Sequence, residues 1–83
     1  MNKRLQHIKD PHLRVLRMRR MEMLMNIKEM ADLVGVSANT LYNWENGHRQ
    51  PRDIKMLRKY GKALGLSLVE VYDAIYGGED AKG

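Results

Sequence analysis

The stretch NIKEMADLVGVSANTLYNWE, residues 26–45, decides the fold of this chain. Asn26 and Glu29 have the spacing of a capping box, in which each side chain accepts a hydrogen bond from the backbone N–H of the other residue. Gly35 suits the left-handed position that follows a helix, where a residue with a Cβ is strained. Ser37 is a preferred N-cap for the next helix. The stretch therefore predicts two short helices joined by a tight turn, which is a helix-turn-helix arrangement.

Further helices are expected on both sides of this pair, because caps and apolar spacing recur outside it. The five predicted helices cover residues 11–23, beginning at Asp10 and Pro11; 27–34; 38–45; 54–64, capped by Asp53; and 68–76, with Ser67 and Glu70 as a second capping box and Gly77-Gly78 as its end. No strand pattern is visible. The predicted fold class is all-α, a compact five-helix domain with the helix-turn-helix at its second and third helices.

Apolar residues at helical spacing predict which side of each helix faces the core. Leu41 and Trp44 are expected there in the third helix. A glycine at position 61 suits a close approach of two backbones. The predicted inward faces of the outer helices are Leu13, Leu16, Arg17, Arg20 and Leu24 in the first, Ile54, Leu57, Gly61 and Leu64 in the fourth, and Leu68, Val71, Tyr72 and Ile75 in the fifth.

The composition limits the possible function classes. A chain of 83 residues forms one small domain, and the absence of cysteine excludes disulfides, Cys-ligated zinc and thiol catalysis. No apolar run approaches the ~18 residues that span a membrane. Ser37 and Ser67 serve as caps and the carboxylates are scattered, so we expect neither enzyme activity nor a cofactor. The histidines lack ligand spacing, so no metal site is expected.

Charge is distributed unevenly along the chain. The net charge is +5, but residues 1–62 hold 14 Lys and Arg against 6 Asp and Glu, whereas residues 63–83 hold 1 against 4. A basic body indicates a polyanionic partner. The predicted organisation is a basic N-terminal arm at 1–10, a helix-turn-helix domain at 11–77 and a flexible tail at 78–83.

The third predicted helix presents a compact, uncharged polar surface. Ala38, Asn39, Tyr42 and Asn43 would face outward. Such residues suit contacts with base edges, while the basic residues elsewhere are available for phosphates. This face has no Arg or Lys for a bidentate guanine contact, whereas asparagine matches the N6 and N7 atoms of adenine. We therefore expect the directly read base pairs to be mostly A·T.

Several blocks of the sequence resemble the lambda-repressor-like (Cro/repressor, XRE-type) helix-turn-helix DNA-binding domains. They are NIKEMA at 26–31, LVGVS at 33–37, LYNWENG at 41–47, RQP at 49–51 and KALGLSL at 62–68. The resemblance extends over residues 12–76. The WENG block at this distance from GVS is quite specific to the family.

The resemblance implies roles for individual residues. The helix at 38–45 looks like the recognition helix, which enters the major groove. Arg20 matches an arginine that pairs, in several members, with the acid at Glu45. The implied base-reading residues are Ala38, Asn39, Tyr42 and Asn43, and the implied phosphate contacts are Asn26, Ile27, Asn46, His48, Arg49 and Arg52. The family usually has Gln at position 27, so only the backbone N–H of Ile27 is left for a phosphate.

The sequence thus predicts a sequence-specific regulator of transcription that binds double-stranded DNA, a repressor acting as a homodimer on a pseudo-palindromic operator. We expect a cytoplasmic protein of bacterial or phage origin, associated with the nucleoid when bound, with no membrane and no small-molecule ligand. Tyr60, Tyr72 and Tyr76 either complete the core or form part of a subunit interface. Two alternatives stay open, a helix-turn-helix module that recruits a protein and a nonspecific DNA-binding protein. The basic face over residues 14–58 favours DNA.

Overall fold

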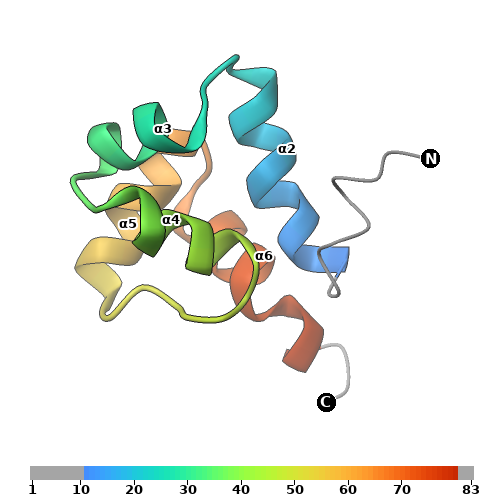
Figure 1. Cartoon of the computed structure of the whole chain (residues 1–83). Helices are drawn as coiled ribbons and strands as arrows, with labels where there is room; N and C mark the ends of the chain where they lie inside the picture. Colours follow the sequence, from blue (N-terminus) through green and yellow to red (C-terminus); the bar gives the residue numbers. More distant parts are fainter. Residues whose placement is uncertain (1–10, 81–83) are drawn as a thin grey trace.

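The computed structural model describes residues 11–80 as five α-helices preceded by one 3₁₀ turn (Figure 1). The elements are η1 (Pro11–Leu13), α2 (Arg14–Glu22), α3 (Ile27–Val34), α4 (Ala38–Glu45), α5 (Ile54–Leu64) and α6 (Leu68–Asp80). This part of the chain contains no strand, so the predicted all-α, five-helix fold is confirmed. Here α2 is the first predicted helix, and α3 and α4 form the helix-turn-helix pair.

The predicted caps begin the helices where the sequence indicated. In the capping box of α3, Glu29 N–H donates to Asn26 Oδ1 at 2.8 Å and Asn26 N–H donates to Glu29 Oε1 at 2.9 Å. Ser37 Oγ accepts from the backbone of α4, and Asp53 Oδ1 does so for α5. These bonds join residues three apart in sequence, so each helix start is determined locally.

The second capping box joins Ser67 and Glu70 at the start of α6. Ser67 N–H donates to Glu70 Oε1 at 2.8 Å, and Glu70 N–H donates to Ser67 Oγ at 3.1 Å. The hydrogen bonds from Ser67 hold the pKa of the Glu70 carboxyl below its usual value. The Glu70 side chain is therefore ionised at neutral pH.

The start of α2 differs from the prediction. Pro11 opens a 3₁₀ turn, and the α-helix begins only at Arg14, with Leu13 in the cap position and no side-chain cap. Asp10, the predicted cap, lies outside the described residues. His12 in this turn is held by α6, because its Nδ1 lies 2.6 Å from the carbonyl oxygen of Ala74. This contact joins the beginning of the domain to its last helix.

The core draws apolar side chains from all five helices. Its fully buried members include Leu16, Met30, Leu41, Tyr60, Leu64 and Val71. The ring centroids of Trp44 and Tyr60 lie 5.0 Å apart, which joins α4 to α5. Trp44 and Tyr60 are thus core residues. Burial raises the pKa of the Tyr60 phenol far above its usual value, and the nearby Glu45 carboxylate raises it further.

The close approach predicted at Gly61 occurs between α5 and α6. A Cβ at this position would lie 2.8 Å from Val71 Cγ1 and 3.1 Å from the Leu66 carbonyl oxygen. Two carbon atoms 2.8 Å apart clash, so only glycine at position 61 allows α5 and α6 to pack this closely.

Two predictions of buried side chains are wrong. Ile54 is 63% exposed, because it lies in the first turn of α5, and Met56 packs against the core there instead. Tyr72 is 45% exposed, because the inward face of α6 is centred on Val71 and Ile75 and Tyr72 lies at its edge. The Tyr72 ring contacts that of Tyr76 at a centroid distance of 4.8 Å.

Two further differences concern helix ends. Leu24 was expected on the inward face of the first helix, but α2 ends at Glu22. Leu24 then adopts a left-handed conformation (φ 59°) and is 90% exposed. The last helix does not end at Gly77 but continues to Asp80. Gly77 lies beside η1, where an added Cβ would be 3.7 Å from His12 Cβ, so glycine in this helix does not coincide with its end.

Candidate nucleic-acid interface

The geometry of α3 and α4 is fixed by the turn between them. Gly35 has φ 92°, and its N–H and that of Val36 both donate to the Ala31 carbonyl, at 2.8 and 2.9 Å. Ala31 is buried, and α3 and α4 pack against each other. In Figure 1, α4 lies at the front of the molecule.

The two sides of α4 differ in burial. Its inward side carries Leu41, Trp44 and Glu45, all of them buried. The candidate base-reading residues lie on the other side: Ala38, Asn39 and Tyr42 are exposed and Asn43 is half-buried. This arrangement leaves a short polar surface whose amide and hydroxyl groups are able to pair with base edges.

The candidate phosphate contacts come from two segments, the loop that follows α4 and the start of α3. His48, Arg49 and Arg52 are exposed in the loop between α4 and α5. The Asn46 side chain is half-buried, and its Nδ2 donates to the Tyr42 carbonyl at 2.8 Å. This bond uses part of the donor capacity that the sequence assigned to phosphate. Asn46 therefore caps the end of α4.

At the start of α3, the capping box occupies two backbone donors. The N–H groups of Asn26 and Glu29 are bonded within the box. The first N–H groups of a helix have no partner in the helix itself, so those of Ile27 and Lys28 are the donors suited to an anion at this end. Asn26 is exposed and Ile27 half-buried.

A cleft between α4 and α5, about 410 Å³ in volume, opens beside the exposed loop. Its walls include Ser37 and Thr40 at the start of α4 and Arg49, Arg52 and Asp53 from the loop. The sequence did not indicate this cleft, because its two walls come from separate segments. It brings two cations close to Ser37 and Thr40 at the start of α4, although none of the four candidate base readers lines it.

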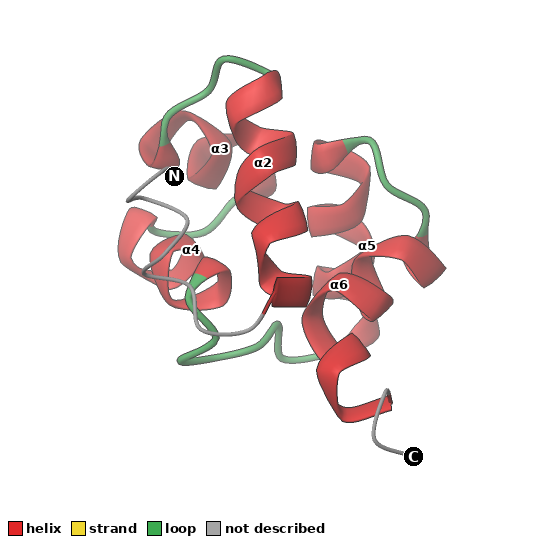
Figure 2. Cartoon of the chain, turned by 90° about the vertical axis from the view of Figure 1, so that its right-hand side faces the viewer, coloured by secondary structure: helices red, strands yellow, loops and turns green. Residues whose placement is uncertain are grey.

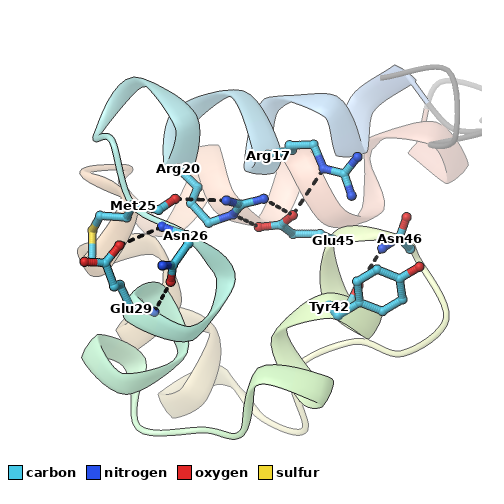
Figure 3. A network of polar contacts seen from close by, with 8 residues as sticks. All are labelled: Arg17, Arg20, Met25, Asn26, Glu29, Tyr42, Glu45 and Asn46. Carbon is cyan, nitrogen blue, oxygen red and sulfur yellow. Dashed lines mark hydrogen bonds and ion pairs between the residues drawn. The ribbon is translucent and has the colours of Figure 1, made fainter. Parts of the chain in front are cut away.

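A buried network of charges holds the other end of α4 (Figure 3). Arg20 Nε and Nη2 donate to the two oxygens of the Glu45 carboxylate at 2.6 and 3.0 Å. Arg20 Nη1 also donates to the Met25 carbonyl at 2.9 Å. Glu45 has no exposed side-chain area. The network therefore ties α2, the turn before α3 and the last residue of α4 together.

Arg17 is a member of this network that sequence reasoning missed as a partner of Glu45. Its Nε lies 3.4 Å from Glu45 Oε1, and its side chain is 12% exposed. The signal was present, because Arg17 and Arg20 are three residues apart and lie on the same side of α2. The carboxylate of Glu45 thus faces two guanidinium groups.

Within residues 11–80, no three His, Asp or Glu side chains gather in a way that would hold a metal ion. None of the helices described there combines the length and the apolar character needed to cross a membrane.

Comparison with known proteins identifies the family. The sequence profile of the helix-turn-helix family matches residues 16–71, which extend from α2 into the first turn of α6. No curated protein and no solved structure matches the chain. The matched region includes the α3–turn–α4 unit, the buried Arg20–Glu45 pair and the polar side of α4. The chain therefore belongs to the lambda-repressor-like, XRE-type helix-turn-helix family of DNA-binding domains.

Proposed function

We propose that the protein is a sequence-specific repressor of transcription that inserts α4 into the major groove of a pseudo-palindromic operator. The observation that supports this most directly is the position of Arg49 and Arg52, which are exposed in the loop after α4 and line a cleft together with Ser37 and Thr40 at the start of that helix. Cations next to a short uncharged face are the arrangement in which phosphates position the protein and side chains read bases. A repressor needs no more than occupation of the promoter.

Asn39 and Asn43 are the proposed readers of adenine. Each amide offers one donor and one acceptor, which match the N7 and N6 groups in the major groove. Ala38 contributes a methyl group that suits contact with the methyl of thymine. Because α4 has no Lys or Arg, half-sites dominated by A·T pairs are expected.

Selection from a random duplex library tests this function. The expected consensus has A·T pairs under α4 and two half-sites whose centres lie one helical turn, about 34–36 Å, apart. Asn39→Ala should weaken binding to the selected duplex by ~1–3 kcal/mol and binding to random duplexes much less. Circular dichroism verifies that the variant is folded. A consensus rich in G·C pairs under α4 would refute the assignment of Asn39 and Asn43.

The same experiment separates the alternative functions. Equal affinity for selected and random duplexes would identify a nonspecific DNA-binding protein. No shift of any duplex at low salt, where phosphate contacts are strongest, would favour a module that recruits a protein.

The homodimer is proposed to form through α6. Val69 and Tyr72 are exposed there, and the Tyr72 ring rests on that of Tyr76. A two-fold axis beside these residues would bury them against the same residues of a second copy. Sedimentation of Tyr72→Lys tests the dimer better than a truncation, because α6 also contributes the core residues Val71 and Ile75. A full-length protein that is monomeric even on DNA would exclude this dimer.

A further inference from the structure

The outer side of α5 is basic and is not used by the proposed interface. Its exposed cations follow the spacing i, i+3, i+4, i+7 and are Lys55, Arg58, Lys59 and Lys62. The helix carries no acidic residue. A shallow hollow of about 390 Å³ between α3 and α5 is lined by Lys59, Lys62, Leu33 and Ala63, which we call the basic surface. Leu33 is 56% exposed, so an apolar side chain stands among these cations.

A second hollow of opposite charge lies where η1, α2 and α6 meet. It measures about 310 Å³ and is lined by His12, Val15, Leu66, Glu70, Asp73 and Ala74, which we call the acidic groove. Val15 is exposed within it, although it is apolar. The helix α6 itself carries no Lys or Arg, but Arg19 of α2 adds to the hydrogen bonds from Ser67 in lowering the pKa of the Glu70 carboxyl. The groove therefore combines an apolar strip with two carboxylates.

Each surface carries charge that no ion pair within residues 11–80 neutralises. In the part of the chain that the structure describes, the ion pairs are Arg17–Glu45, Arg19–Glu22 and Arg20–Glu45, all of them made by arginines of α2. Lys59, Lys62 and Asp73 take part in none of them. Unpaired charges of one sign beside exposed apolar side chains are typical of a surface that meets a partner.

We infer that the basic surface of one copy of this protein binds the acidic groove of another copy. In this contact, Leu33 lies against the apolar lining of the groove, which is formed by Val15, Leu66 and Ala74. Lys59 and Lys62 face Glu70 and Asp73. The two surfaces have opposite charge, and each offers exposed apolar area to the other. The same chain therefore carries both partner surfaces, so a second copy of this protein can supply the acidic groove that the basic surface binds.

The contact is heterologous and open-ended. The basic surface belongs to α3 and α5, at one side of Figure 1, whereas the acidic groove lies towards η1 and α2, the side that Figure 2 shows from the front. A head-to-tail contact between different surfaces adds further copies unless it closes into a ring. On α6, Asp73 lies one turn from Val69 and from Tyr76, so the acidic groove borders the residues proposed for the homodimer. Small hollows of this kind place the contact among weak interfaces, below about 1,200 Å² in total.

Exchange of charges between the two surfaces tests this inference without DNA. Sedimentation of the full chain at ~0.01 M salt, where screening extends over roughly 30 Å, should give a mass that rises with concentration beyond two copies. At ~1 M salt, with screening within roughly 3 Å, the larger species should disappear. Lys62→Glu alone and Asp73→Lys alone should each weaken this growth at least about tenfold. An equimolar mixture of the two variants should restore it, because each then offers the surface that the other needs.

Two substitutions of the same kind provide controls. Lys55→Glu reverses a charge at an exposed position of α5 that does not line the hollow. Asp32→Lys reverses a charge at an exposed position of α3 that does not line the hollow either. Both should leave the growth beyond two copies intact. Glu70 is left unchanged because it caps α6. Circular dichroism verifies the fold of every variant.

Three results would overturn the inference. The first is a wild-type protein that never exceeds two copies at low salt. The second is a mixture of Lys62→Glu and Asp73→Lys that associates no better than either variant alone. The third is a loss of DNA affinity in Lys62→Glu without any loss of self-association, which would assign the basic surface to flanking DNA. None of these results bears on whether α4 reads an operator, so the proposed function is tested separately.

Discussion

Removal of Arg20 from the buried charge network should destabilise the fold strongly. Arg20→Met eliminates two hydrogen bonds to Glu45, at 2.6 and 3.0 Å, and one to the Met25 carbonyl at 2.9 Å. The Glu45 carboxylate remains without exposed area and faces Arg17 Nε at 3.4 Å. Loss of one partner of a buried ion pair costs ~3–5 kcal/mol. Because Arg17 remains, we expect about 3 kcal/mol, the lower end of that range.

The other members of the network should follow a definite order. Glu45→Gln leaves Arg20 and Arg17 opposite a neutral amide and should cost a similar amount, about 3 kcal/mol. Arg17→Met removes the longest of the three contacts to the carboxylate, so in a double-variant cycle the coupling of Arg17 to Glu45 should be weaker than that of Arg20. The double variant Arg20→Met with Glu45→Gln should lose less than the sum of the two single losses, by at least about 1.5 kcal/mol.

Urea denaturation followed by circular dichroism measures these free energies of unfolding. Native domains have ~5–15 kcal/mol in total, so a loss of 3 kcal/mol is readily measured. Single losses that are below about 1 kcal/mol and strictly additive would mean that the two residues act as independent, solvated charges. That result would refute the conclusion that the network fixes α4 against α2.

Two further predictions concern the loop and the glycines. Arg49→Ala or Arg52→Ala should weaken all duplexes about equally and lower the salt slope of binding by about one unit, whereas Arg58→Ala, an equal loss of charge on α5, should leave the slope unchanged. A change in base preference instead would show that the loop reads sequence. Gly61→Ala should lower the stability by ~1–3 kcal/mol, because its Cβ would lie 2.8 Å from Val71 Cγ1. Gly77→Ala should raise it by roughly 0.5–1 kcal/mol, because its Cβ would make only ordinary contact with His12 at 3.7 Å. Thermal melts of both variants measure this, and a shift of the same sign in both would contradict the packing described for α6.

The starts of α3, α4 and α5 were predictable from the sequence because their cause is local. The capping bonds of Asn26, Ser37 and Asp53 span three residues, so residue type and spacing are sufficient. The end of α3 at Gly35 is similarly local.

Burial at the edges of the helices was less predictable. The spacing of apolar residues shows which side of a helix faces the core, but not how much of that side the neighbouring helices cover. Ile54 and Tyr72 lie where that cover ends, and both are exposed. Gly77 was expected to end α6, but its contact with η1, 65 residues earlier at His12, is a tertiary effect that no local pattern reveals.

The candidate site was predictable to different degrees. The outward side of α4 follows from periodicity, since Leu41 and Trp44 define the inward side. The pairing of Arg20 with Glu45 came from the family resemblance, because 25 residues separate them in sequence. The second arginine, Arg17, and the cleft beside Arg49 both depend on how distant segments pack.

The bonds that hold the end of α4 and the following loop involve main-chain oxygens of the very residues proposed to read DNA. The N–H groups of His48 and Arg49 donate to the carbonyl of Asn43, and the Asn46 amide donates to that of Tyr42. Such bonds form whatever side chain those two positions carry. Positions 38, 39, 42 and 43 are therefore suited to randomisation in a combinatorial library, whose members would keep one scaffold while differing in the operator they select.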